Sequence, residues 1–277
     1  MNRREGTCTS HSSATLFYRS WLPDQAAPKA MLAIVHGFGE HTDLYEHLGE
    51  FFVAAGYGVI ALDLRGHGRS SGARGFIRHW QDYRDDVATL IALARRIGPA
   101  LPIFLVGHSM GGLLAIDYAT MHPEGLRGIV AMGPAIGKIG VSRFLVWLSR
   151  FLSRIWPSFS LDTRLQSAAM SRDPVAVARL EADPLVHGRG TARLGTEVFE
   201  AIDRVQRGAE LLRIPILIQH GEADTVAHPD GSRAFFDRMT FPDREFLTYP
   251  GGFHNLFVDL NWKEVLTDIE QWVGRHV

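Results

Sequence analysis

The chain has 277 residues, of which 46% are hydrophobic and 21% charged, and 29 Lys and Arg balance 30 Asp and Glu to a net charge of −1. This composition is typical of a globular protein and excludes a disordered or fibrous chain. The balanced charge supplies no extended basic surface, so we expect no nucleic-acid partner.

Cysteine content and the N-terminus bear on the cellular compartment. The single cysteine, Cys8, cannot form an internal disulfide. Residues 1–13 are mostly polar and lack the apolar region of a signal peptide, so we predict a frayed N-terminus. No stretch approaches the roughly 18 consecutive apolar residues of a spanning helix. We therefore expect a cytoplasmic protein, with any membrane contact peripheral.

Short runs of β-branched and apolar residues alternate along the chain with segments of helical periodicity. We predict buried strands at residues 30–35, 58–62, 103–106, 128–132 and 214–218, with a weaker strand at 245–249. Apolar residues recur every three or four positions between them, as at Val87, Leu90 and Ile91, and predict amphipathic helices. Apolar strands alternating with helices indicate a mostly parallel, doubly wound α/β fold.

One segment interrupts this alternation. Residues 137–208 contain no buried-strand pattern and carry prolines at positions 157, 174 and 184. We predict that this segment is a helical cap inserted into one α/β core, which comprises residues 1–136 and 209–277.

A nucleophile motif, G-x-S-x-G, occupies residues 107–111, between a predicted strand and a helical run. In this setting the serine sits on a sharp turn whose flanks tolerate only glycine, so we predict that Ser109 is a nucleophile. Two backbone N–H groups must then stabilise the oxyanion. We assign them to Met110, which follows the nucleophile, and to Phe38 in the glycine-rich loop after strand 30–35.

A serine nucleophile also needs a general base and an acid that orients the base. In this architecture both follow the nucleophile along the chain, each in a loop after a late strand. Asp224 and His254 occupy those loops, with Glu222 as the rival acid and Asp230 as a more distant one. His36, Glu40 and His41 have no standard metal-site spacing, so the sequence predicts neither a metal nor a cofactor.

Together these motifs resemble those of the monoacylglycerol lipase family of α/β-hydrolases, in particular its microbial, lysophospholipase-like members. The resemblance covers nearly the whole chain and is most specific in the cap. The matching segments are residues 36–41, 63–70, 107–112, 171–174, 183–186, 220–224 and 249–254. Animal members carry a cysteine three positions after the acid, where this chain has Ala227, so their inhibition by thiol reagents is not implied here.

The resemblance implies a serine esterase that hydrolyses monoacylglycerols to fatty acid and glycerol through the triad Ser109, Asp224 and His254. Lysophospholipase and short-chain carboxylesterase activities are alternatives. An aminopeptidase needs acidic groups that capture an amino terminus, but residues 125–161 hold five cations and no acid, although acids follow later in the cap. A non-enzymatic binding module would be expected to lack a triad member.

The cap contains a strongly amphipathic segment. Six apolar residues fall within an arc of about 140° on one helical face; they are Phe144, Trp147, Leu148, Phe151, Leu152 and Ile155. We expect Phe144, Trp147, Leu148 and Phe151 to bind the acyl chain, and the helix, with its flanking arginines, to touch a micelle or membrane surface. Plain packing against the core is the alternative.

Overall fold

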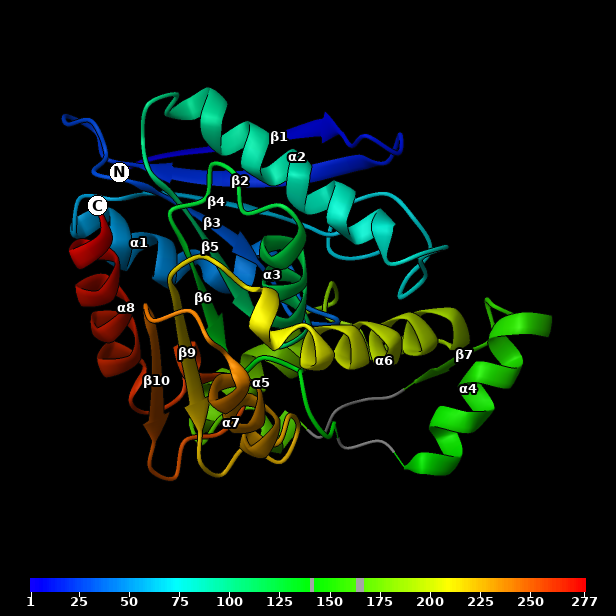
Figure 1. Ribbon diagram of the computed structural model, residues 1–277. Helices are drawn as coiled ribbons and strands as arrows, with labels where there is room; N and C mark the ends of the chain where they lie inside the picture. The colour runs from blue at the N-terminus through cyan, green and yellow to red at the C-terminus, as the bar shows by residue number, and fades with distance from the viewer. Residues whose placement is uncertain (140–141, 163–166) are drawn as a thin grey trace.

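The computed structural model describes residues 1–139, 142–162 and 167–277. Eight of its strands form one sheet: β1 (Asn2–Thr9), β2 (Thr15–Leu22), β3 (Met31–Val35), β4 (Gly58–Leu62), β5 (Ile103–His108), β6 (Gly128–Met132), β9 (Ile216–Gly221) and β10 (Arg244–Tyr249). They lie in the order β1-β2-β4-β3-β5-β6-β9-β10 (Figure 1). All pairs from β4 to β10 are parallel, which confirms the predicted α/β fold.

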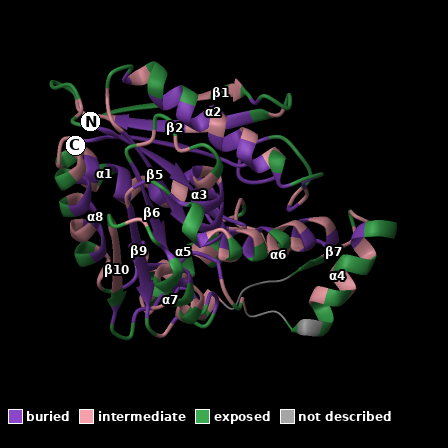
Figure 2. Ribbon diagram, in the orientation of Figure 1, coloured by how far each residue is buried: buried purple, intermediate pink, exposed green. Residues whose placement is uncertain are grey.

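Helices cover both faces of this sheet (Figure 1). The core helices are α1 (Glu46–Ala54), α2 (Gln81–Ile97), α3 (Met110–Met121), α7 (Pro229–Arg238) and α8 (Trp262–His276). Helices α1 and α8 pack on one face, and α2, α3 and α7 pack on the other. In β3, Ala33 and Val35 contact the second group while Leu32 and Ile34 contact the first, which explains why this strand is apolar throughout. The central strands are accordingly buried (Figure 2).

The prediction of a frayed N-terminus is wrong. Residues Asn2–Thr9 form β1, which pairs antiparallel with β2, and β2 pairs antiparallel with β4. The first four residues of β1 are exposed, so the strand is polar and lacks the apolar alternation by which strands are identified in a sequence.

Between β6 and β9 the chain leaves the sheet and forms α4 (Arg143–Ile155), β7 (Ser160–Asp162), α5 (Pro174–Ala182), β8 (Arg189–Thr191) and α6 (Ala192–Arg207). We call the described residues between 137 and 208 the cap; the exact division of the chain at those positions stays a prediction. Helix α6 joins the core through Arg204, whose Nε donates to Asp117 of α3 at 2.8 Å. Helix α4 packs against α6, at the periphery of the molecule (Figure 1).

Candidate active site

Ser109 lies on the sharp turn between β5 and α3. Its φ is +53° and its ψ is −116°, a combination that non-glycine residues rarely adopt. A Cβ at Gly107 would lie 2.2 Å from the carbonyl oxygen of Gly111, and one at Gly111 would lie 2.2 Å from that of Val35. Glycine is therefore required on both sides of the serine, as the motif predicts.

The structure brings Ser109, His254 and Asp224 together from three separate loops. The Ser109 hydroxyl donates to His254 Nε2 at 2.8 Å, and His254 Nδ1–H donates to Asp224 Oδ2 at 2.7 Å. The exposed fractions of the three residues are 8%, 1% and 2% respectively. This series of hydrogen bonds provides a base next to the hydroxyl and a carboxylate that fixes the imidazole tautomer.

Asp224, rather than Glu222, is the carboxylate beside His254. Its Oδ1 accepts from the backbone N–H groups of Val226 and Ala227 at 2.8 and 2.9 Å, and its Oδ2 lies 3.2 Å from His220 Nε2. Burial by itself raises the pKa of Asp224. The interactions with His254 and His220 outweigh burial and lower this pKa well below its ordinary range. Glu222 is exposed and accepts from Thr248 Oγ1 at 2.9 Å.

Burial also shifts the pKa of His254. Removal from water lowers this pKa below the ordinary 6.5, and the charge of Asp224 opposes the shift only in part. A base must be deprotonated to act, so kcat/KM on a soluble ester should fall at acid pH with a single apparent pKa below about 6.5. A pH–rate profile measures this; an acid limb centred above pH 7, or activity that stays flat down to about pH 4, would contradict it.

The two predicted oxyanion donors, Met110 and Phe38, follow β5 and β3, which are neighbouring strands of the sheet. Met110 is the first residue of α3, and Phe38 lies in the loop after β3. Neither backbone N–H donates to an acceptor among the described residues. This leaves both groups available for a negatively charged oxygen.

Sequence reasoning missed the residue that organises this region. Glu40 is 3% exposed, and its carboxylate accepts from four donors. They are Gly37 N–H at 2.8 Å, Tyr45 hydroxyl at 2.6 Å, Asn255 Nδ2 at 3.2 Å and His108 Nδ1 at 3.2 Å. Burial would raise the pKa of Glu40, but His108, the Tyr45 hydroxyl and the Gly37 N–H hold this pKa well below the ordinary carboxyl range. Glu40 thus connects the loop of Phe38 to the loop of His254. In the sequence, the only indication of this role is that Glu40 lies within the motif at residues 36–41.

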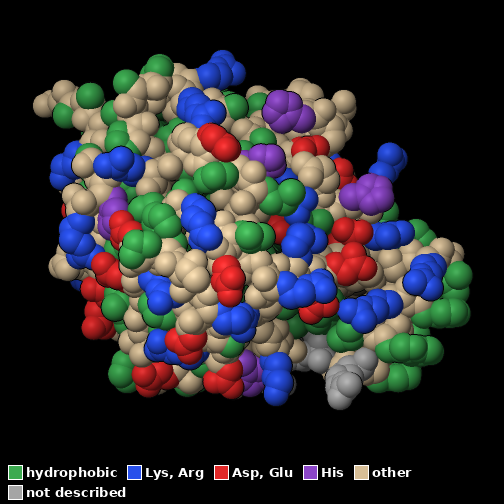
Figure 3. All heavy atoms as spheres, in the orientation of Figure 1, with side chains coloured by type: hydrophobic (Ala, Val, Ile, Leu, Met, Phe, Trp, Pro, Cys, Tyr) green, Lys and Arg blue, Asp and Glu red, His purple; other side chains and the backbone are tan. Residues whose placement is uncertain are grey.

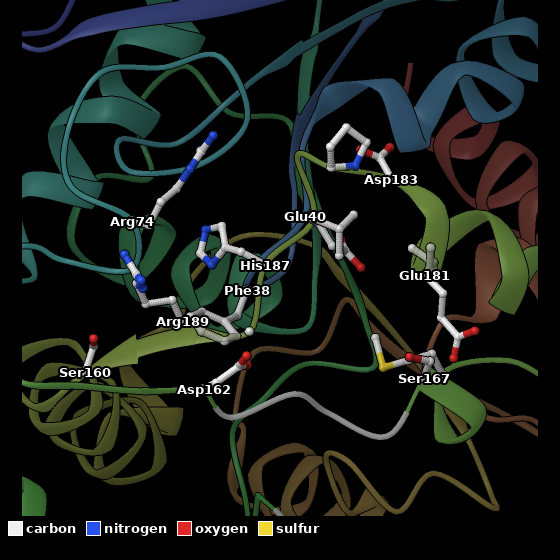
Figure 4. A pocket seen from close by; sticks show the side chains of 15 residues that line it. Phe38, Glu40, Arg74, Ser160, Asp162, Ser167, Glu181, Asp183, His187 and Arg189 are labelled. Carbon is white, nitrogen blue, oxygen red and sulfur yellow. The ribbon is translucent and has the colours of Figure 1, made fainter.

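A cavity of about 870 Å³ lies between the cap and the loop that carries Phe38. Its lining combines apolar and charged side chains. On one side lie Arg74, His187 and Arg189, and Glu181 lies on the other side (Figure 4). Burial and the neighbouring guanidinium groups of Arg74 and Arg189 lower the pKa of His187 to about 4. A substrate portion bound here would contact the loop that carries Phe38.

The predicted acyl-chain residues of α4 do not line this cavity. Phe144, Trp147 and Phe151 are 66%, 61% and 51% exposed, and Leu148 is half-buried against the rest of the cap. The helical period shows correctly that these residues share a face, but it cannot indicate whether that face points inward or outward. The rings stack on one another, with centroids 6.1 Å apart, and the hydrophobic side chains gather at this end of the molecule (Figure 3).

Known proteins share both the sequence and the fold. A family described as "Serine aminopeptidase, S33" matches residues 26–261. A monoacylglycerol lipase of Mycolicibacterium smegmatis is 34% identical across 99% of this chain and 98% of its own. Human monoglyceride lipase is 31% identical across 94% of this chain and 87% of its own. The crystal structure of Paleococcus ferrophilus monoacylglycerol lipase matches with a TM-score of 0.87 at 35% identity, covering 95% of this chain and 99% of its own. The chain belongs to the monoacylglycerol lipase family of α/β-hydrolases.

Proposed function

We propose that this protein is a cofactor-independent serine esterase that hydrolyses monoacylglycerols to a fatty acid and glycerol. The observation that carries the proposal is the series of hydrogen bonds from Ser109 through His254 to Asp224 at the carboxyl ends of the strands. Support comes from the monoacylglycerol lipases to which the chain is similar along its whole length.

In the acylation half of this mechanism, Ser109 Oγ attacks the ester carbonyl carbon while its proton passes to His254 Nε2. Asp224 stabilises the imidazolium that forms, and the N–H groups of Phe38 and Met110 stabilise the oxyanion. The tetrahedral intermediate then collapses, the bond to the glycerol oxygen breaks, and His254 gives its proton to that oxygen. Water repeats the sequence on the acyl-enzyme and releases the fatty acid.

Lysophospholipid hydrolysis is the second candidate function. On one side of the cavity the guanidinium groups of Arg74 and Arg189 offer donors for a phosphate group (Figure 4). A phospholipase of Bacillus subtilis is 28% identical across 93% of this chain and 99% of its own.

A substrate panel tests the proposal. We expect the highest kcat/KM on monoacylglycerols, lower values on lysophospholipids and triacylglycerols, and none on aminoacyl amides. The reason is that a monoacylglycerol places an uncharged glyceryl group, with no second acyl chain, against the Phe38 loop. A preference for lysophospholipids would establish the second candidate, and hydrolysis of aminoacyl amides would replace the lipase by an aminopeptidase.

We also propose that the exposed face of α4 rests on membranes or micelles that supply the substrate to a cytoplasmic enzyme. Trp147, Phe144 and Phe151 form the apolar surface, and Arg150 and Arg154 are exposed on the same helix. Such a helix lies in the interface plane, and its arginines favour anionic lipid. Within the described residues no helix has the length and apolar character needed to cross a bilayer.

The variant Trp147→Ser/Phe151→Ser should lower activity on vesicle-borne long-chain monoacylglycerol by about tenfold or more, because each aromatic side chain loses about 1.5–3 kcal/mol of burial in lipid. Hydrolysis of a soluble short-chain ester should change less than about twofold, because neither side chain lines the cavity. Leu211→Ser is the matched control, since Leu211 is 64% exposed away from α4. Equal losses on both substrates would overturn the membrane role.

A further inference from the structure

Two cap segments contact the core at the two loops that the proposed mechanism uses. Residues 183–187 lie on the oxyanion loop, and we call these contacts the oxyanion clamp. Residues 170–172 lie on the loop that carries His254, and we call these contacts the histidine clamp. Both segments overlap the cap motifs at residues 171–174 and 183–186, which have no role in the proposed reaction itself.

The oxyanion clamp holds the loop of Phe38 by two hydrogen bonds, and a third hydrogen bond joins it to the loop after β4. His187 N–H donates to the Gly39 carbonyl at 3.1 Å, and His187 Nε2–H donates to the Gly66 carbonyl at 3.1 Å. His41, which is fully buried, donates from Nε2 to Asp183 Oδ2 at 3.0 Å. The ring of Phe38 also meets the ring of His187 edge to face, with centroids 5.8 Å apart. The direction of the Phe38 N–H thus depends on cap residues.

Gly39 shows how closely the cap approaches this loop. Its φ is +76°, and a Cβ on it would lie 2.0 Å from the carbonyl oxygen of His187. The backbone of the cap therefore occupies the space that a side chain would need. The cap can approach the oxyanion loop this closely only because position 39 is glycine.

The histidine clamp is built around Asp259, whose exposed fraction is 0%. Its carboxylate accepts from the N–H of Phe253, the residue before His254, at 3.0 Å and from Arg172 Nε at 2.9 and 3.1 Å. On the other side of His254, the N–H of Asn255 donates to the Met170 carbonyl at 2.7 Å. The cap therefore fixes the residues that immediately precede and follow the proposed base.

We propose that Asp183 and Arg172 are positioning residues, through which the cap aligns the oxyanion donors and the base. This alignment acts even on esters that are too small to need the cap for binding. The inference rests on the proposed function. Displacing a reacting group by about 1 Å can lower a rate about a hundredfold. Loss of either clamp should therefore lower kcat, while KM for a small soluble ester changes little.

The test uses the intact protein with Asp183→Ala and Arg172→Gln. Two readouts are measured: kcat and KM on a short-chain soluble ester, and the rate at which a small fluorophosphonate labels Ser109. Both kcat and the labelling rate should fall about ten- to a hundredfold. Asp183→Asn, which keeps an acceptor for His41, and Arg172→Lys, which keeps the charge, should restore part of the loss. The exposed cap residues Arg179 and Asp203 supply the matched controls Arg179→Gln and Asp203→Asn, which should leave both readouts unchanged.

Arg172→Gln leaves the carboxylate of Asp259 buried without its cation, which could unfold the protein. The double variant Arg172→Gln/Asp259→Asn removes this negative charge as well, so we expect it to stay folded. Its labelling rate should stay low, because the link to the cap is still absent. If the variants label at the wild-type rate while their Tm falls, the proposal is wrong. Both clamps would then only attach the cap to the core. A wild-type protein that labels rapidly but hydrolyses no monoacylglycerol would refute the proposed function alone and leave the labelling test of the clamps valid.

Discussion

Replacing Ser109 with alanine is expected to lower ester hydrolysis by about five to six orders of magnitude. The substitution removes the single oxygen that attacks the carbonyl, and His254 and Asp224 cannot substitute for it because they act on its proton. The loss should be equal for long-chain monoacylglycerols and soluble short-chain esters, since both require the acyl-enzyme. Steady-state rates on the two substrates, with the uncatalysed rate subtracted, measure it. Residual activity above a tenth of wild type would remove Ser109 from the mechanism.

The same position allows a control for folding. Alanine retains the Cβ at a φ of +53°, so Ser109→Ala should unfold at a temperature close to that of the wild type. Glycine adopts this backbone conformation without strain, so Ser109→Gly should be inactive but more stable by about 1 kcal/mol. For a chain of this size that corresponds to a rise in Tm of about 2–3 °C. An inactive variant with a raised Tm shows that the loss of activity is chemical and not a failure to fold.

Asp224→Asn should lower kcat about ten-thousandfold. The amide that replaces the carboxylate donates to His254 Nδ1, which forces the imidazole proton onto Nε2 and prevents that atom from accepting the proton of Ser109. Binding should be nearly unchanged, because Asp224 is buried behind His254. The measurement is kcat and KM on one soluble ester.

Glu222→Gln is the matched comparison, two residues away in the same loop. Its side chain is exposed and contacts Thr248, so kcat should change less than about twofold. A loss in Glu222→Gln comparable to that in Asp224→Asn would transfer the role of the acid to Glu222.

The central strands and the order of the site residues could be predicted because each depends on local sequence. A strand buried on both faces, such as β3, must be apolar at every position, so the run Met31–Val35 is visible without a structure. The turn at Ser109 excludes side chains on both flanks, so its glycines appear at fixed spacing. Local sequence leaves Asp224 and Glu222 as rivals, because both follow β9 within three positions. The family resemblance favours Asp224, and in the fold it is Asp224 that contacts His254.

The orientation of α4 and the clamps could not be predicted, because they depend on contacts distant in sequence. His41 and Asp183 are 142 residues apart, and Arg172 and Asp259 are 87 residues apart. Periodicity groups Phe144, Trp147 and Phe151 on one face, yet only the packing of α4 against α6 determines that this face points outward.

Strand β1 has a consequence for self-association. It lies at the edge of the sheet, where unpaired backbone groups can template the addition of a strand from another molecule. Here that edge carries Arg3, Arg4 and Glu5, all exposed, and Arg19 of β2 pairs with Glu5 at 2.7 Å. Charged side chains along an exposed edge strand disfavour the addition of a further strand. The polar residues of β1, which prevented its prediction as a strand, therefore protect this edge of the sheet from edge-to-edge aggregation.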